Sequence, residues 1–175
     1  NTAIGSRSLD ANTTGNGNTA LGVDCLGGNT TAINNTAVGN NALKANTTGT
    51  DNVAVGAEAL DGNTTANGNL AVGYRSLSGA NTGAYNVALG NYSLLVNTSG
   101  QYNTGVGEST LYTNTTGSYN VAIGRLALYT NNNSYNTAVG YRSLRLNTSG
   151  QFNTAVGANT LDSNTTASNN SAFGD

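Results

Sequence analysis

The sequence predicts an all-β protein, a parallel β-solenoid of about ten coils with 17 residues in each coil. The first observation is a repeat: segments like Asn1-Thr2-Ala3-Ile4-Gly5 occur eleven times, 17 residues apart except for one step of 16. The second is the order within each unit, where a short apolar run ends in Gly and a second run ends in Asn-Thr-Thr-Gly, as expected for two short strands separated by turns. The third is composition: 31 Asn, 26 Thr and 24 Gly disfavour helices, and helical repeats need about thirty residues or more per unit.

Composition also excludes several classes of function. Six Lys plus Arg against eight Asp plus Glu give a net charge of −2, which lacks the basic footprint that nucleic acid requires. Without His, and with a single Cys, one chain cannot build a structural zinc site or a Ser-His-Asp triad. No stretch approaches the roughly 18 apolar residues of a membrane span. We therefore expect no enzyme activity, cofactor, metal or nucleic-acid partner, and no membrane insertion by this segment.

The first strand of each unit alternates between two faces. In Asn18-Thr19-Ala20-Leu21-Gly22, Thr19 and Leu21 share one face and Ala20 lies on the other. The position of Leu21 always holds a larger apolar residue, so we predict that its face points inward. A second invariant column, the Leu column, is predicted to point inward from a second strand; it includes Leu26, Leu43 and Leu60.

The glycine that closes the first strand occurs in every unit and forms the Gly column, which includes Gly22, Gly39 and Gly56. An invariant glycine indicates a turn that needs positive φ, or a backbone too crowded for a Cβ atom. We expect this column to be structural.

The strand alanines form a third column, which is Ala in ten of eleven units. Placed outward by the alternation, these small side chains would allow another chain to approach closely. The Ala column therefore predicts a homo-oligomer packed along the solenoid axis, with a trimer as the first choice; its interface candidates are Ala20, Ala37, Ala54, Ala71 and Ala88. The alternative is that small side chains merely fit a flat sheet surface.

Two columns of asparagine run through the repeat. The first opens every unit, as at Asn18, Asn35 and Asn52, and its amides can hydrogen-bond from coil to coil. The second begins the Asn-Thr-Thr or Asn-Thr-Ser segments, which also match the sequence required for N-glycosylation. Those candidate glycosylation sites are Asn12, Asn29, Asn46, Asn63, Asn97, Asn114, Asn147 and Asn164. A glycan on every rung would be crowded at a coil spacing of about 4.8 Å.

An aromatic ladder occupies the position before the first asparagine, but only in the later units. It consists of Tyr85, Tyr102, Tyr119, Tyr135 and Phe152. Stacking from coil to coil is one interpretation, and a surface for sugar rings or another exposed ligand is the other. The Thr pairs after the second asparagine raise ice binding as a further hypothesis, although turn chemistry also explains them.

The remaining signals are weak. No column of carboxylates recurs, so no metal site or facing pair of catalytic acids is predicted. Arg7, Arg75 and Arg142 are interpreted as solvated charges at strand edges. Cys25 replaces a residue that is otherwise Ser, Ala or Thr, which indicates a small filler.

Units such as Asn120-Val121-Ala122-Ile123-Gly124, followed by Ala127-Leu128, resemble the head repeats of YadA-type trimeric autotransporter adhesins and are similar to repeats of phage tail-fibre and surface-fibre proteins. The resemblance extends through all ten units. It implies a left-handed β-roll, three chains side by side, and attachment to a host surface without chemistry. The 17-residue unit departs from the adhesin pattern, and no stalk, neck or anchoring barrel occurs in this sequence.

We therefore expect a single β-solenoid domain over residues 1–175 that forms an adhesive segment of an extracellular fibre, on a cell or virion surface. Its partners would be copies of itself, and a host-surface protein or glycan. A self-polymerising filament, a phage receptor-binding fibre and an ice-binding protein are the alternatives. Because the chain starts on a repeat boundary and stops within a motif, we expect a fragment or processed piece of a longer fibre. The ten coils of this segment, rising about 4.8 Å each, would make a solenoid about 48 Å long.

Overall fold

The computed structural model describes residues 1–174 and contains eleven strands of three residues each. The strands are β1 (Thr2–Ile4), β2 (Thr19–Leu21), β3 (Thr36–Val38), β4 (Val53–Val55), β5 (Leu70–Val72), β6 (Val87–Leu89), β7 (Thr104–Val106), β8 (Val121–Ile123), β9 (Thr137–Val139), β10 (Thr154–Val156) and β11 (Ser171–Phe173). Among the residues described, no helix is long and apolar enough to cross a membrane.

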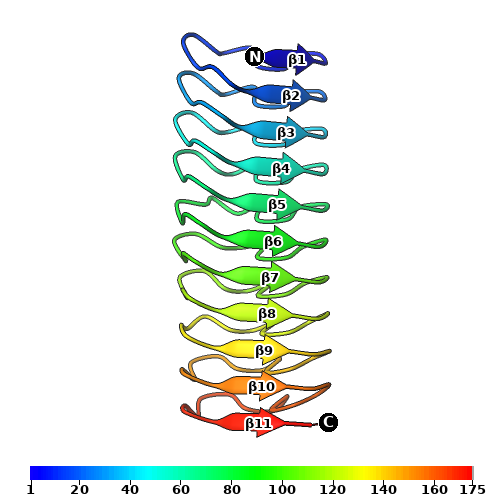
Figure 1. Cartoon of the computed structure of the whole chain (residues 1–175), viewed down its shortest axis with the longest axis vertical. Helices are drawn as coiled ribbons and strands as arrows, with labels where there is room; N and C mark the ends of the chain where they lie inside the picture. Colours follow the sequence, from blue (N-terminus) through cyan, green and yellow to red (C-terminus); the bar gives the residue numbers. More distant parts are fainter. Residues whose placement is uncertain (175) are drawn as a thin grey trace.

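All strands belong to one parallel sheet in chain order from β1 to β11. Each residue pairs with its equivalent in the next unit, as Ala20 pairs with Ala37. Figure 1 shows the result, a straight stack of coils with β1 at one end and β11 at the other. The predicted parallel β-solenoid of about ten 17-residue coils is confirmed.

The prediction of a second strand in each coil is wrong. The segment that contains the Leu column consists of turns, because two of its residues adopt left-handed φ angles, 56° at Asp24 and 51° at Leu26. Such residues cannot continue an extended run. The turns still bond from coil to coil, since Leu26 N–H donates to the Ala42 carbonyl at 3.0 Å. The leucines nevertheless point inward as predicted: Leu26, Leu43 and Leu60 are completely buried.

The predicted assignment of the strand faces is also wrong. The strand alanines point into the coil, and the interface candidates Ala20, Ala37, Ala54, Ala71 and Ala88 are at most 1% exposed in a single chain. The alternation itself holds, because the residues on either side of each alanine face outward.

The physical reason is the narrow interior, where the alanines share the core with the Leu column and with a buried column of small residues that includes Cys25, Ala42 and Ser76. Gly105, the one exception in the Ala column, illustrates the limit: a Cβ there would lie 2.6 Å from Oγ of Ser93 and 2.7 Å from Oγ1 of Thr110.

Both asparagine columns are internal and hydrogen-bonded, as the structural interpretation predicted. Asn35 donates its backbone N–H to Oδ1 of Asn18 at 3.0 Å and its Nδ2 to the Gly49 carbonyl at 2.9 Å. In the second column, Asn46 Nδ2 donates to Oδ1 of Asn29 at 3.2 Å and to the same Gly49 carbonyl at 2.9 Å. The interior therefore combines leucine and alanine with two continuous amide ladders, which satisfy polar groups that burial would otherwise leave unpaired.

The Gly column has both properties expected of it. Gly56 adopts φ of 134°, and a Cβ on it would lie 2.5 Å from the carbonyl oxygen of Gly73 in the next coil. Gly22 and Gly39 share the positive φ. Close stacking of these turns therefore excludes any side chain.

Candidate functional site

The outer face of the sheet carries a row of apolar side chains that continues through every strand. Its main feature is the outer apolar column, whose members are Ile4, Leu21, Val38, Val55, Val72, Leu89, Val106, Ile123, Val139, Val156 and Phe173. Val55 and Val72 are 37% and 36% exposed, and Leu21 is 45% exposed. The parallel column on the same face holds Thr, Val, Leu or Ser, and none of the described strands contains a charged residue. Surfaces of this kind mark interaction sites when they are continuous.

The aromatic ladder is confirmed as a stack. The ring centroids of Tyr85, Tyr102, Tyr119, Tyr135 and Phe152 lie 5.1 to 5.3 Å apart, and the rings are within 12° of parallel. Each inner ring is thus covered on both faces by its neighbours, although the side chains are about half exposed. Ring faces are therefore not available as a platform for sugars except at the two ends, and the ladder presents edges and hydroxyl groups to solvent.

The side chains of the candidate glycosylation sites point into the coil, where a glycan could not be attached. Asn29, Asn46, Asn63, Asn97, Asn114 and Asn147 are completely buried. Asn12 and Asn164, in the terminal coils, are partly buried, and their Nδ2 atoms also donate to carbonyls three residues on. Because a glycan would attach to this nitrogen, the folded chain contradicts glycosylation at these positions.

The threonines beside these asparagines use their hydroxyls within the chain. Thr13 Oγ1 donates to the Thr30 carbonyl at 3.0 Å, and Thr30 Oγ1 donates to the Thr47 carbonyl at 3.2 Å. This column therefore completes the turn and retains only acceptor capacity toward solvent. Ice binding stays a prediction.

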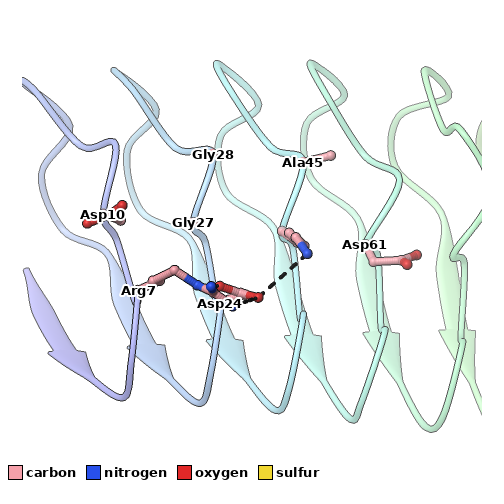
Figure 2. Close-up of a pocket in the computed structure, with 8 residues that line it drawn as sticks. Arg7, Asp10, Asp24, Gly27, Gly28, Ala45 and Asp61 are labelled. Carbon is pink, nitrogen blue, oxygen red and sulfur yellow. Dashed lines mark hydrogen bonds and ion pairs between the residues drawn. The ribbon is translucent and has the colours of Figure 1, made fainter.

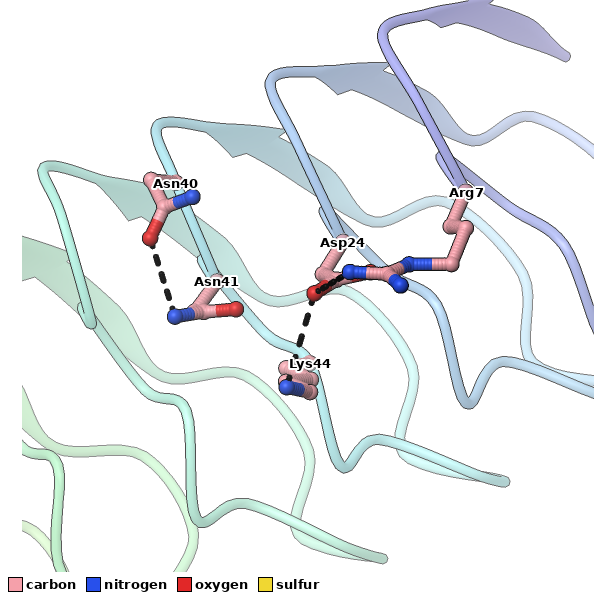
Figure 3. A network of polar contacts seen from close by, with 5 residues as sticks. All are labelled: Arg7, Asp24, Asn40, Asn41 and Lys44. Carbon is pink, nitrogen blue, oxygen red and sulfur yellow. Dashed lines mark hydrogen bonds and ion pairs between the residues drawn. The ribbon is translucent and has the colours of Figure 1, made fainter.

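A charged groove of about 410 Å³ lies on the turn side of the first four coils, where Gly27 and Gly28 leave no side chains (Figure 2). Asp24 accepts a hydrogen bond from Arg7 Nη2 at 2.7 Å, and its carboxylate forms an ion pair with Lys44 Nζ at 3.6 Å (Figure 3). The Arg7 hydrogen bond lowers the pKa of the Asp24 carboxyl. The cations of this groove are thus already paired with an acid of the chain.

Asp61 closes the other end of the groove (Figure 2). Its Oδ1 atom is buried without a hydrogen-bond partner, and burial, followed by the nearby charge of Glu58, raises the pKa of its carboxyl. Within residues 1–174, no three His, Cys, Asp or Glu side chains form a group that could hold a metal ion.

Sequence reasoning missed the ion pairs that join neighbouring coils. Arg7 pairs with Asp24, and Arg75 pairs with Glu58 at 3.2 Å. Arg142 instead lies 5.0 Å over the ring of Tyr141. The side chains of Arg7 and Arg75 are solvated as interpreted, with 65% and 45% of their surface exposed, but they also pair with acids of the neighbouring coil. The sequence contains the information needed to predict these ion pairs, because opposite charges at the same position of adjacent units lie next to each other in a solenoid with this register.

Cys25 has the role expected of a small filler. It is completely buried, and its Sγ atom contacts the Ala37 carbonyl at 3.1 Å, as Ser76 Oγ contacts the Ala88 carbonyl at 2.8 Å. Burial raises the pKa of this thiol.

Comparison with protein-family models, curated proteins and solved structures gives no significant match to this chain.

Proposed function

We propose that this chain is a rigid, non-enzymatic segment of an extracellular attachment fibre, on a cell or virion surface, and that copies associate side by side through the outer face of the sheet. The observation that supports the proposal is the outer apolar column, in which eleven aliphatic or aromatic side chains stand in register on an uncharged surface. Water contact with such a column is unfavourable, and its burial would stabilise an assembly.

A second copy of the chain is the partner that fits this face best. It carries the same side chains at the same rung spacing, so apolar groups can interdigitate along the whole length without loss of register. Three copies around one axis would close the arrangement and leave no face exposed. The trimer, like the left-handed coil, also follows from the resemblance to adhesin heads, but the face in contact is the outer apolar column in place of the buried alanines.

Mass measurement in solution tests the association. We expect light scattering to give three times the chain mass of 17.6 kDa. The double variant Val55→Lys/Val72→Lys places charges on the face and should give a single-chain mass, whereas Thr64→Lys/Thr65→Lys, at exposed turn residues, should leave the trimer intact. Circular dichroism would check that both variants fold.

A single-chain mass for the unmodified protein, or equal masses for the two variants, would overturn the proposed interface. A mass that grows with concentration and persists in the Val55→Lys/Val72→Lys variant would favour the end-to-end filament over the side-by-side assembly.

A further inference from the structure

The aromatic ladder is a second repeating surface, separate from the outer apolar column. Its four tyrosines and Phe152 are 46% to 54% exposed, although stacking covers the faces of the inner rings. The accessible parts are consequently ring edges, which carry partial positive charge, and phenol hydroxyls, which both donate and accept hydrogen bonds. Hydrogen bonds along this edge, such as Gln101 N–H to Ser118 Oγ at 3.0 Å, use backbone and other side chains, and within residues 1–174 none of them uses a tyrosine hydroxyl.

The surroundings of the ladder are uncharged. The preceding residue in each coil is Ala84, Gln101, Ser118, Ser134 or Gln151, and the strands that follow contain no charged residue. The site therefore favours a neutral ligand with many hydroxyl groups over a nucleic acid or a charged peptide, which would need opposite charges to replace their lost hydration.

The spacing of the ladder restricts the ligand further. A ligand can engage every rung only if it repeats at the 5.1 to 5.3 Å spacing of the rings. Side chains on one face of an extended peptide recur about every 6.6 Å, and a polyproline helix repeats about every 9 Å, so both lose register within a few rungs. An extended β-linked hexopyranose chain, as in cellulose or chitin, advances by close to one ring spacing per sugar. Successive sugars are flipped, so the chain keeps one sugar at every rung and presents the same face at every second rung.

We propose that the aromatic ladder binds an extended, neutral β-linked polysaccharide that lies parallel to the solenoid axis, with one sugar opposite each rung. Tyrosine hydroxyls bond to sugar hydroxyls, and ring edges contact the sugar oxygens. This assignment rests on the attachment role proposed above, for which it supplies a class of ligand, and it uses a different surface from the contact between copies.

Binding to insoluble cellulose and chitin, with amylose as the coiled α-linked comparison, provides the first test. We expect retention on cellulose or chitin and none on amylose. With soluble cello- and chito-oligosaccharides, calorimetry should show affinity that increases with each added sugar until every ring of the ladder is engaged, since repeated contacts act together.

Three double variants separate the contributions. Tyr102→Ala/Tyr119→Ala removes two central rings and should lower affinity by at least about tenfold, because it interrupts the repeat. Tyr102→Phe/Tyr119→Phe keeps the stack and removes two hydroxyls, which should lower affinity about two- to tenfold per hydroxyl. Tyr112→Ala/Tyr129→Ala removes another stacked pair, with centroids 5.0 Å apart, and should leave binding unchanged.

The assignment would be overturned by absence of retention on both polymers, by unchanged affinity in the Tyr102→Ala/Tyr119→Ala variant, or by affinity that does not depend on chain length. It would also be overturned if that variant lost the mass of the assembly, since the ladder would then belong to the contact between copies. A single-chain protein that still binds chitin through these tyrosines would reject the assembly and retain the polysaccharide site.

Discussion

Residues 1–73 contain no aromatic side chain, whereas residues 74–174 contain all nine tyrosines and both phenylalanines. The backbone of the two parts is nevertheless the same: each strand in both has three residues and pairs in register with the next. The difference teaches that the interior columns determine the coil, while the outward positions vary without changing it. Surface chemistry can therefore be assigned to the outward columns of each part separately.

The largest expected effect tests whether the interior is equivalent in both parts. In Gly56→Ala and in Gly90→Ala, the new Cβ would lie 2.5 Å from the carbonyl oxygen of the next coil, at φ angles near 135°. We expect each to destabilise the chain by about 3–5 kcal/mol through strain and overpacking. Urea unfolding would measure both. A large difference between them would show that the two parts are not equivalent inside.

Gly17→Asn is the matched control for these substitutions. Gly17 has φ of 69°, and the equivalent residue of the next coil, Asn34, adopts φ of 59°. The atom closest to a new Cβ on Gly17 is Oδ1 of Asn34, the end of a flexible side chain that can rotate away. We therefore expect a change within about 1 kcal/mol.

The first asparagine column gives the second comparison. Asn52→Ala would remove the acceptor of the Asn69 backbone N–H and the donor to the Ala66 carbonyl, and Asn103→Ala would do the same to Asn120 and Gly117. Each carbonyl keeps its second donor, Asn63 or Asn114, but each substitution leaves one buried backbone N–H unpaired. We therefore expect losses of about 1–3 kcal/mol in both parts. The exposed Asn40→Ala should cost much less. Equal stability of Asn52→Ala and Asn40→Ala in urea unfolding would contradict a role for the buried ladder.

Periodicity predicted the coil, the stacking and the asparagine ladders because a 17-residue unit with a fixed glycine and two fixed asparagines is compatible with few backbones. It did not predict which strand face is inside. An alternating Thr-Ala-Val strand satisfies either choice, and the narrow interior decides it, since even a Cβ on Gly105 would lie 2.6 Å from Ser93 Oγ. The turn conformation of Leu26 was hidden for a related reason, since leucine rarely adopts positive φ.

The candidate sites were likewise predicted only in part. The sequence predicted the aromatic ladder because aromatic residues recur at one position of the unit, but the orientation of the rings depends on the backbone geometry at Tyr102 and its neighbours. The groove at Gly27 and Gly28 was missed because it arises from absent side chains, which leave no repeating signal.

A third prediction transfers the aromatic ladder into the part that lacks it. Asn34 and Asp51 occupy the ladder position and have φ of 59° and 60°, close to the 55° of Tyr102. The variant Asn34→Tyr/Asp51→Tyr should therefore form a stacked pair without strain and stabilise the chain by about 0.5–1.5 kcal/mol. Thermal unfolding would measure this gain. A loss of stability would show that the first part cannot accept aromatic rings, and the equivalence of the two backbones would fail.

The smallest expected effect concerns two carboxylates of the aromatic-free part whose pKa values move in opposite directions. The pKa of Asp24 is lowered by its hydrogen bond with Arg7, so its contribution to stability is present above the ordinary value of 3.8 and is lost as pH falls through the folded-state pKa. The pKa of Asp61 is raised by burial, so its ionisation destabilises the folded chain as pH rises above 3.8.

Near pH 7, we therefore expect Asp24→Asn to lower the melting temperature slightly. We expect Asp61→Ser, which introduces the residue found at the same position in the next coil, to raise it. Near pH 3, where both carboxyls are largely protonated in the unfolded chain, the stabilisation by Asp61→Ser should shrink toward zero. Melting curves at the two pH values would check both signs, and a stabilisation by Asp61→Ser that is larger in acid would show that the buried Oδ1 atom is not the source of the effect.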